Sequence, residues 1–187
     1  MSGWTKLNET AIGADLIDRW ALDYLGRYAS SAENLRRVLL RRIRRRARDD
    51  PDMMQQMQPL IDTAIERHRR SGLLDDAAYA TLRTAALYRR GESLAGIRAR
   101  LVAKGIPAAL AAEALSALRT GAADPDLAAA CALARRRRLG PYRIAPGDHA
   151  RELAVFARAG FARRVAEAVL ACRDIEAIEA IARDGIG

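Results

Sequence analysis

Few residues in the sequence have the types and spacing that catalysis or metal binding requires. The two histidines, His68 and His149, lie far apart, and neither stands beside a serine or cysteine in a nucleophile pattern. The two cysteines, Cys131 and Cys172, form no CxxC motif and no Cys/His cluster, so we expect no zinc site. We expect both to be free thiols buried in helices. The pattern predicts no catalytic residue, no metal and no cofactor.

The other candidates for chemistry have better structural explanations. Asp75 and Asp76 could bind a metal ion or exchange protons, but they directly follow Gly-Leu-Leu at an expected helix start, where carboxylates cap free amides. Residues 89–98, RRGESLAGIR, lack the Gly-Lys-Ser/Thr ending of a phosphate-binding loop. His68 lies late in an expected helix, where a core position or the helix dipole explains it. We therefore predict that the protein is not an enzyme.

Arginine is the one residue type that could carry a function. The 187-residue chain has 32 basic and 23 acidic residues, a net charge of +9, and Lys6 and Lys104 are its only lysines. The arginine side chain can hold phosphate or carboxylate groups with two parallel hydrogen bonds. A codon-biased genome that replaces lysine throughout would produce the same composition. The positions of the arginines must therefore decide between the two explanations.

Residues 35–50, LRRVLLRRIRRRARDD, contain eight arginines. On a helix, four of them would form one stripe, with Arg36 and Arg45 beside it; the four are Arg37, Arg41, Arg44 and Arg48. Within the helix only Glu33, opposite Arg37, offers an acidic partner, and unpaired arginines four residues apart repel by about 0.2–0.5 kcal/mol. A stripe of arginines that destabilises its own helix is better explained as a binding face than as a neutral surface. Arginines near a helix C-terminus also interact favourably with the dipole, which is a competing structural reason.

Two further arginine groups could extend this surface. Residues 135–138 are four consecutive arginines at an expected helix end, where we expect one or two to pack against the protein or to snorkel, with the stem on the surface and the charge in water. Arg89 and Arg90 could form a basic track with Arg98. The candidate DNA- or filament-binding residues are Arg36, Arg37, Arg41, Arg44, Arg45, Arg48, Arg89, Arg90, Arg98, Arg135, Arg136 and Arg138. Phosphate contacts of this kind depend strongly on salt and are independent of base sequence.

The segments that position these arginines carry the signals of helices. Apolar residues recur at spacings of three and four, and no segment alternates as a half-exposed strand would. Ser30 and Glu33 could form a capping box, and the Asp-Pro pairs at 50–51 and 124–125 are typical helix starts. The residues expected to point inward from the helix after Asp76 are Tyr79, Leu82, Ala86 and Leu87. The fold class is therefore all-α.

Two segments repeat one pattern at an offset of 55 residues. Residues 101–115 are LVAKGIPAALAAEAL and residues 156–170 are FARAGFARRVAEAVL, so that Gly105 matches Gly160. Residues 20–70 show the same order of three helices. We predict an elongated array of three tandem three-helix repeats, because units of about 50 residues bury too little surface alone. The expected divisions are a tail at 1–14 and units at 15–72, 73–121 and 122–187, the last with a C-terminal helix.

The order of these motifs resembles that of the RecX regulatory proteins, which modulate the RecA recombinase. The resemblance covers roughly residues 16–172. It is carried by ALDYLGRYASSAENLRRVLLRR (21–42), SGLLDDAAYA (71–80), YRRGESLAGIRARLVAKGIPAALAAEAL (88–115) and LAVFARAGFARRVAEAVL (153–170). No single piece is diagnostic, but their order and spacing together are fairly specific.

The resemblance implies a non-enzymatic regulator that binds in the groove of the RecA–DNA filament, limits its growth or activity, and also binds DNA directly. We expect a monomer that inhibits RecA sterically or allosterically in recombination and repair. The alternative is a general basic helical nucleic-acid-binding protein without a recombinase partner. The sequence shows neither a secretory signal nor an apolar run of the roughly 20 residues that span a bilayer, so we expect a cytoplasmic protein.

Overall fold

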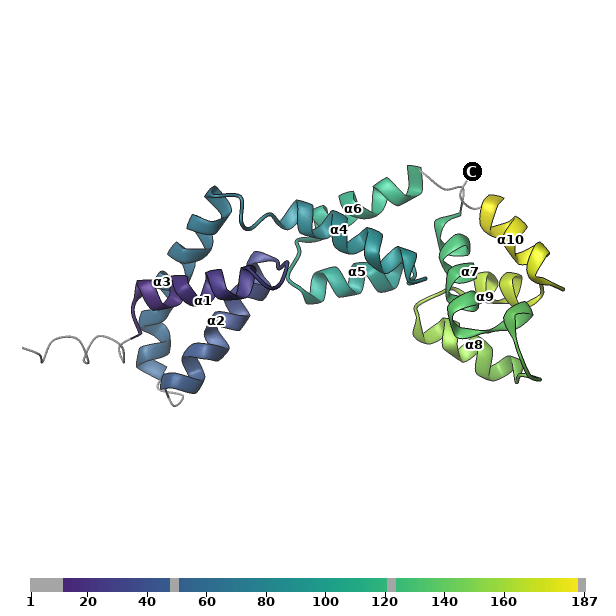
Figure 1. The fold of residues 1–187 in the computed structure, drawn as a ribbon, viewed down its shortest axis with the longest axis horizontal. Helices are drawn as coiled ribbons and strands as arrows, with labels where there is room; N and C mark the ends of the chain where they lie inside the picture. Colours follow the sequence, from purple (N-terminus) through teal and green to yellow (C-terminus); the bar gives the residue numbers. More distant parts are fainter. Residues whose placement is uncertain (1–11, 48–50, 121–123, 185–187) are drawn as a thin grey trace, which may run out of the picture. The chain divides into compact units, whose positions relative to one another are not determined.

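The structure, a computed structural model, describes residues 12–47, 51–120 and 124–184. Within these ranges the chain forms ten α-helices and one 3₁₀ helix and contains no strand, so the all-α prediction is confirmed (Figure 1). The helices are α1 (Ala14–Leu25), α2 (Ala32–Ala47), α3 (Pro51–Arg70), α4 (Asp76–Arg89), α5 (Leu94–Ala103), α6 (Ala108–Thr120), α7 (Pro125–Arg137), η1 (Gly140–Tyr142), α8 (His149–Arg158), α9 (Arg163–Leu170) and α10 (Ile175–Asp184).

The chain groups into two compact units, Met1–Tyr79 and Ala80–Gly187. The first contains α1, α2, α3 and the first turn of α4, and the second contains the rest of α4 and the helices that follow. This grouping does not test the three-helix repeats, which stay a prediction.

In the first unit, α1, α2 and α3 pack against one another around an apolar core (Figure 1). In α2, Leu35, Leu39 and Ile43 are fully buried and recur every four residues, so they form one face. In α3 the buried residues are Met57, Ile61, Ala64, Ile65 and His68. Burying a Leu or Ile side chain contributes about 1.5–3 kcal/mol. The buried face of α2 therefore fixes the side on which its arginines meet solvent.

Helix α2 begins at Ala32, and Ser31 rather than Ser30 caps it. The Asn34 amide donates to Ser31 Oγ at 3.2 Å, whereas the Ser30 hydroxyl donates to the Ser31 carbonyl. The carboxylate of Glu33 pairs with arginines of the next turn. The predicted capping box is therefore wrong, because Asn34 and not Glu33 holds the third helical position, whose amide needs an acceptor.

The buried stripe of α4 differs in part from the predicted one. Ala80, Thr84 and Leu87 are buried, but Leu82 is 69% exposed, so the prediction holds for Leu87 and is wrong for Leu82. Each helical residue turns by about 100°, which places residue 82 about 200° from residue 80. The two residues therefore cannot both face inward. The remaining predicted residues, Tyr79 and Ala86, are partly buried.

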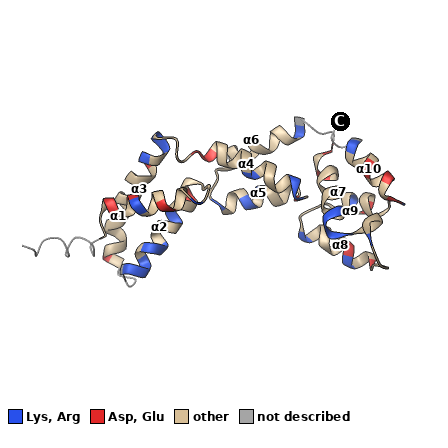
Figure 2. Cartoon of the chain, in the orientation of Figure 1, with Lys and Arg blue, Asp and Glu red and all other residues tan. Residues whose placement is uncertain are grey.

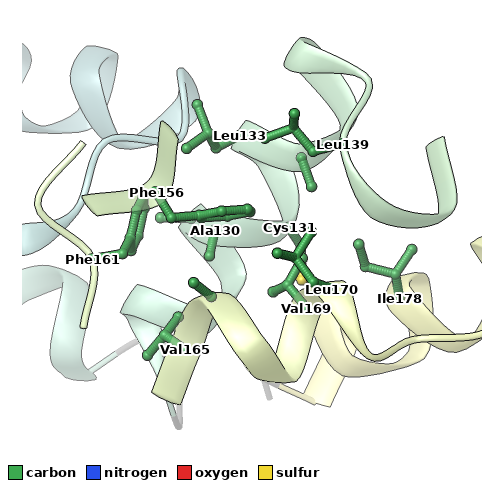
Figure 3. Close-up of a cluster of buried hydrophobic side chains, with 13 residues drawn as sticks. Ala130, Cys131, Leu133, Leu139, Phe156, Phe161, Val165, Val169, Leu170 and Ile178 are labelled. Atoms are coloured by element: carbon green, nitrogen blue, oxygen red, sulfur yellow. The ribbon is translucent and has the colours of Figure 1, made fainter. Parts of the chain in front are cut away.

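In the second unit, α5 and α6 pack as a pair, and the apolar core lies among α7, α8, α9 and α10 (Figure 3). The rings of Phe156 and Phe161 meet edge to face with 5.9 Å between their centroids. Cys131 belongs to the same core. Phe156 of α8 and Val165 and Val169 of α9 therefore point into this core.

The glycines matched by the 55-residue offset end their helices in the same way. Gly105 has φ +77° and Gly160 has φ +82°, in the left-handed region that favours glycine. The amide after each glycine donates to the carbonyl five residues earlier at 3.1 Å, from Ile106 in one case and Phe161 in the other. The two matched segments therefore share one local geometry.

The starts of α2 and α5 are also built alike. Each has a serine cap, Ser31 or Ser93, whose hydroxyl accepts from the amide three residues later at 3.2 and 3.0 Å. The first amide of each helix donates at 2.8 Å to an aspartate on a later helix, Asp76 in α4 and Asp126 in α7. These bonds satisfy amides that a helix start leaves free. We call this arrangement the serine–aspartate joint.

Candidate nucleic-acid and filament interface

The arginines at the start of the α2 stripe are neutralised by acidic partners. Arg37 Nε lies 2.9 Å from Glu33 Oε1, and Arg36 Nε lies 3.3 Å from Glu33 Oε2. Arg36 also pairs with Asp62 of α3. The sequence pattern identified Glu33 as a partner of Arg37 but gave Arg36 no partner, because Asp62 comes from another helix. The expectation that this stripe largely lacks acidic partners is therefore wrong for its first turn.

The second half of α2 carries several exposed arginines. Arg41, Arg44 and Arg45 are exposed, and among the described residues none of them forms an ion pair. Figure 2 shows the basic residues gathered toward this end of the helix. We call these three residues the α2 cluster. Arg48, also predicted for this stripe, lies outside the described residues.

Arg42 shows that not every arginine of α2 is available for binding. Its side chain is partly buried and donates to the Trp20 carbonyl at 3.3 Å. Its guanidinium carbon also lies 5.9 Å from the centroid of the Trp20 ring, within the range of a cation–π contact. This side chain therefore helps to hold α1 against α2.

The basic track predicted from Arg89 and Arg90 to Arg98 stays a prediction. Arg89 ends α4, Arg90 follows in the turn, and Arg98 lies on α5; all three are exposed. Arg98 lines a groove of about 750 Å³ together with apolar residues of α5 and α6 such as Val102 and Leu115. Its immediate surroundings are therefore largely apolar.

All four arginines of the run 135–138 are exposed, so none of them is buried against the protein; that one or two lay their stems along its surface stays a prediction. Arg138 takes the left-handed conformation with φ +57° and ends α7. The Leu139 amide then donates to the Ala134 carbonyl at 2.9 Å, and the Leu139 side chain is buried. The left-handed turn thus buries the leucine and leaves the arginines in solvent.

Three arginines that sequence reasoning missed share a groove with the predicted Arg136. They are Arg100 on α5, Arg137 on α7 and Arg158 at the end of α8. Arg137 was within reach of the sequence, because it belongs to the run at 135–138. Nothing in the sequence indicated that Arg100 and Arg158 would meet that run, because tertiary packing brings these helices together.

Packing within the fold accounts for His68, Cys131 and Cys172, three of the residues that could have carried chemistry. His68 is buried, with Nε2 3.1 Å from Asp18 Oδ1, and the predicted core role is confirmed. Both cysteines are free; Cys131 is buried and Cys172 is partly buried. Burial raises the pKa of the Cys131 thiol to about 11 and also raises the pKa of Cys172. Raised pKa values keep both thiols protonated and poorly nucleophilic near neutral pH.

The paired carboxylates at the start of α4 serve the fold. Asp75 Oδ1 accepts from the Ala78 amide at 2.9 Å, as a helix cap does, which confirms the predicted role. Asp76 accepts from the Ala32 amide and pairs with Arg69 at 3.1 Å. Among the described residues no group of three or more His, Cys, Asp or Glu side chains is placed to hold a metal ion. None of the helices in the described ranges is both long enough and apolar enough to cross a bilayer.

Comparison with known proteins identifies the family. No family model matches the chain, and no solved structure matches it. The regulatory protein RecX of Myxococcus xanthus is 35% identical over 158 residues, which cover 82% of this chain and 83% of the relative. The regulatory protein RecX of Agrobacterium fabrum is 36% identical over 107 residues, 56% of this chain and 55% of that protein. The chain therefore belongs to the RecX family of regulatory proteins.

Proposed function

We propose that this protein binds the RecA–DNA filament and inhibits the recombinase during recombination and repair. Membership of the RecX family carries the proposal, because it makes the chain a regulator of RecA and not an enzyme. The side chains agree with that role, since His68, the two cysteines and Asp75 are engaged in packing or a helix cap. Inhibition then arises from occupying the filament and needs no chemical step.

The α2 cluster is the predicted surface whose geometry best suits a filament-bound DNA backbone. Arg41, Arg44 and Arg45 lie in the second half of α2, are exposed, and have no ion pair among the described residues. Arginine binds phosphate with two parallel hydrogen bonds, and these contacts are independent of base sequence. Arg36 and Arg37 would have to give up Glu33 before binding a phosphate. They therefore contribute less than the cluster.

We also propose that the chain acts as a monomer in the cytoplasm and is built from three three-helix repeats. Two local features support the repeats. The glycine stops at Gly105 and Gly160 have the same geometry, and the serine–aspartate joint occurs at both α2 and α5. A repeated joint suits an array in which each unit is fixed to its successor.

The test compares binding to RecA–DNA filaments for two variants that lose equal charge. The double variant R41Q/R44Q removes two residues of the α2 cluster, and the control R19Q/R27Q removes two exposed arginines elsewhere in the first unit. Each phosphate contact contributes about 0.7–0.9 to the slope of log affinity against log salt. We expect the slope to fall by about 1.4–1.8 for the cluster variant alone. Equal behaviour of both variants would make the cluster an ordinary solvated surface.

The second candidate function is general nucleic-acid binding without a recombinase partner. The net charge of +9 and the exposed arginines favour it, because such a surface attracts any polyanion. RecA strand exchange, measured while the protein is titrated in at fixed salt, separates the two. Inhibition below the concentration that saturates bare DNA supports the recombinase partner. Strand exchange that is unaffected when bare DNA is already saturated supports the second function.

A further inference from the structure

A concave basic groove in the second unit is not explained by the surfaces described so far. It has a volume of about 740 Å³ and lies where α5, the end of α7 and the end of α8 meet. Its charged walls are Arg100, Arg136, Arg137, Arg158 and one acid, Glu92, while several glycines lie between them. Only Arg136 belongs to the residues that the sequence pattern singled out.

The glycines give the groove a floor made of backbone. A Cβ atom at Gly91 would lie 2.4 Å from the Leu133 amide nitrogen and 2.7 Å from the Ala129 carbonyl oxygen. A Cβ atom at Gly160 would lie 2.7 Å from Ser93 Oγ. These helix ends can therefore approach so closely only without side chains.

Hydrogen bonds hold this floor in place. Ser93 Oγ donates to the Ala159 carbonyl at 2.7 Å, which joins the start of α5 to the end of α8. The Leu94 amide donates to Asp126 of α7 at 2.8 Å, which joins the same helix start to the third helix of the groove. The groove is therefore a built feature of the unit, and its arginines project from fixed elements.

The charges in the groove are unbalanced. Arg100 pairs with Glu92, with 2.5 Å between Nε and Oε2. Arg136, Arg137 and Arg158 are exposed and form no ion pair among the described residues. Three neighbouring positive charges repel one another, and an anion in the groove would relieve that repulsion. No aromatic side chain lines the groove, so it offers no surface for stacking a base.

We propose that this groove binds the phosphates of one nucleic-acid strand, through Arg136, Arg137 and Arg158. The inference rests on the DNA-binding part of the proposed function and assigns it a site. A strand fits better than a single phosphate ion, because the three arginines come from two helix ends and face a space much larger than one phosphate group. Glu92 limits the affinity, because its carboxylate repels phosphate and occupies Arg100.

The role of Glu92 allows two opposite tests of the proposal, one variant that should weaken nucleic-acid binding and one that should strengthen it. The variant R137Q/R158Q removes two groove arginines that no other surface in the proposed function uses. The variant E92Q keeps the size of the side chain, removes the acid and frees Arg100. The control R173Q/R183Q removes two exposed arginines of the same unit that do not line the groove. A misfolded protein could explain weaker binding, but it could not explain tighter binding by E92Q.

The measurement is fluorescence anisotropy of a labelled oligothymidylate, titrated with the full chain at several salt concentrations. With a slope of about 0.7 for each phosphate of a single strand, we expect R137Q/R158Q to bind roughly tenfold more weakly at 0.15 M salt and to lose about 1.4 from the salt slope. We expect E92Q to bind about threefold more tightly and to gain about 0.7 in slope. The control should change neither quantity by a comparable amount.

Three outcomes would overturn the proposal in different ways. If R137Q/R158Q matches the control while the wild-type chain binds DNA, the groove is not the site and the proposed function stands. If the wild-type chain binds no DNA at low salt, the DNA-binding part of the proposed function fails together with the groove. If inorganic tripolyphosphate competes as strongly as an unlabelled strand at equal phosphate concentration, the groove is a polyphosphate site and the assignment to nucleic acid is wrong.

Discussion

Replacing Gly91 by alanine tests the close approach that forms the floor of the basic groove. Gly91 has φ +73°, and an alanine Cβ would overlap the α7 backbone, 2.4 Å from the Leu133 nitrogen. Gly72 is the matched control, because its φ is +75° but nothing lies within 4 Å of the position of its Cβ. Both substitutions place alanine in the left-handed region, which costs about 1–2 kcal/mol. Only the first one also forces two helices apart.

The structure allows the difference in stability between G91A and G72A to be worked out. Overlap with backbone atoms cannot be relieved by a rotamer change, and forcing extra volume into a packed site costs about 1–3 kcal/mol. We therefore expect G91A to be less stable than G72A by about 2 kcal/mol. For a chain of this size that difference lowers Tm by about 4–8 °C. We also expect G91A to weaken strand binding in the groove, whereas G72A should not.

Thermal unfolding followed by circular dichroism measures the stability difference, and hydrogen exchange with mass spectrometry localises it. In G91A, faster exchange should appear in α5 and α7, and in G72A around the end of α3. Equal destabilisation by the two substitutions would refute the reasoning, because the left-handed φ alone would then account for both. A stability of G91A equal to wild type would show that the close packing of this turn against α7 is absent in solution.

Two further predictions concern the second unit. Asp126→Ala leaves the Leu94 amide without its acceptor and should lower the free energy of unfolding, measured by urea titration, by about 1–3 kcal/mol. Asp126→Asn keeps an acceptor oxygen and should lower it clearly less. Equal losses for the two variants would mean that this hydrogen bond does not hold the serine–aspartate joint. Cys131, whose pKa is about 11, should be roughly a thousandth thiolate at pH 8 and should resist iodoacetamide in the native protein, whereas the partly buried Cys172 should react first. Peptide mass mapping would contradict this if both cysteines were alkylated at the same rate.

The sequence predicted those features that depend on residues close together in the chain. The caps at Asp75 and Asp124 are confirmed, and the matched Gly105 and Gly160 share one local geometry, because each feature follows from spacing within one helix or turn. The sequence pattern placed the cap of α2 at Ser30, whereas the structure places it at Ser31. The two adjacent serines offer equivalent local signals, so spacing alone could not choose between them. In α4 small and apolar residues allowed more than one stripe, and packing selected the one without Leu82.

Contacts between helices account for what the sequence could not predict about the interface. Asp62 of α3 neutralises Arg36, and no spacing within α2 could indicate it. The groove brings Arg100 and Arg158 to Arg136 across three helices, and only the folded unit shows that they meet. The left-handed residue that ends α7 is Arg138 and not a glycine, so no signal in the sequence indicated this turn. The exposure of the whole arginine run could therefore not be predicted from composition.

RecA's DNA-dependent ATPase activity tests the central claim most directly. The protein is titrated into RecA and single-stranded DNA at fixed salt, and its binding to the same DNA without RecA is measured under the same conditions. We predict that the ATPase rate falls at protein concentrations that leave bare DNA mostly unbound, and that R41Q/R44Q requires roughly tenfold more protein for the same effect. An ATPase rate that stays constant up to the concentration that saturates bare DNA would contradict the assignment of this chain as a regulator of the RecA filament.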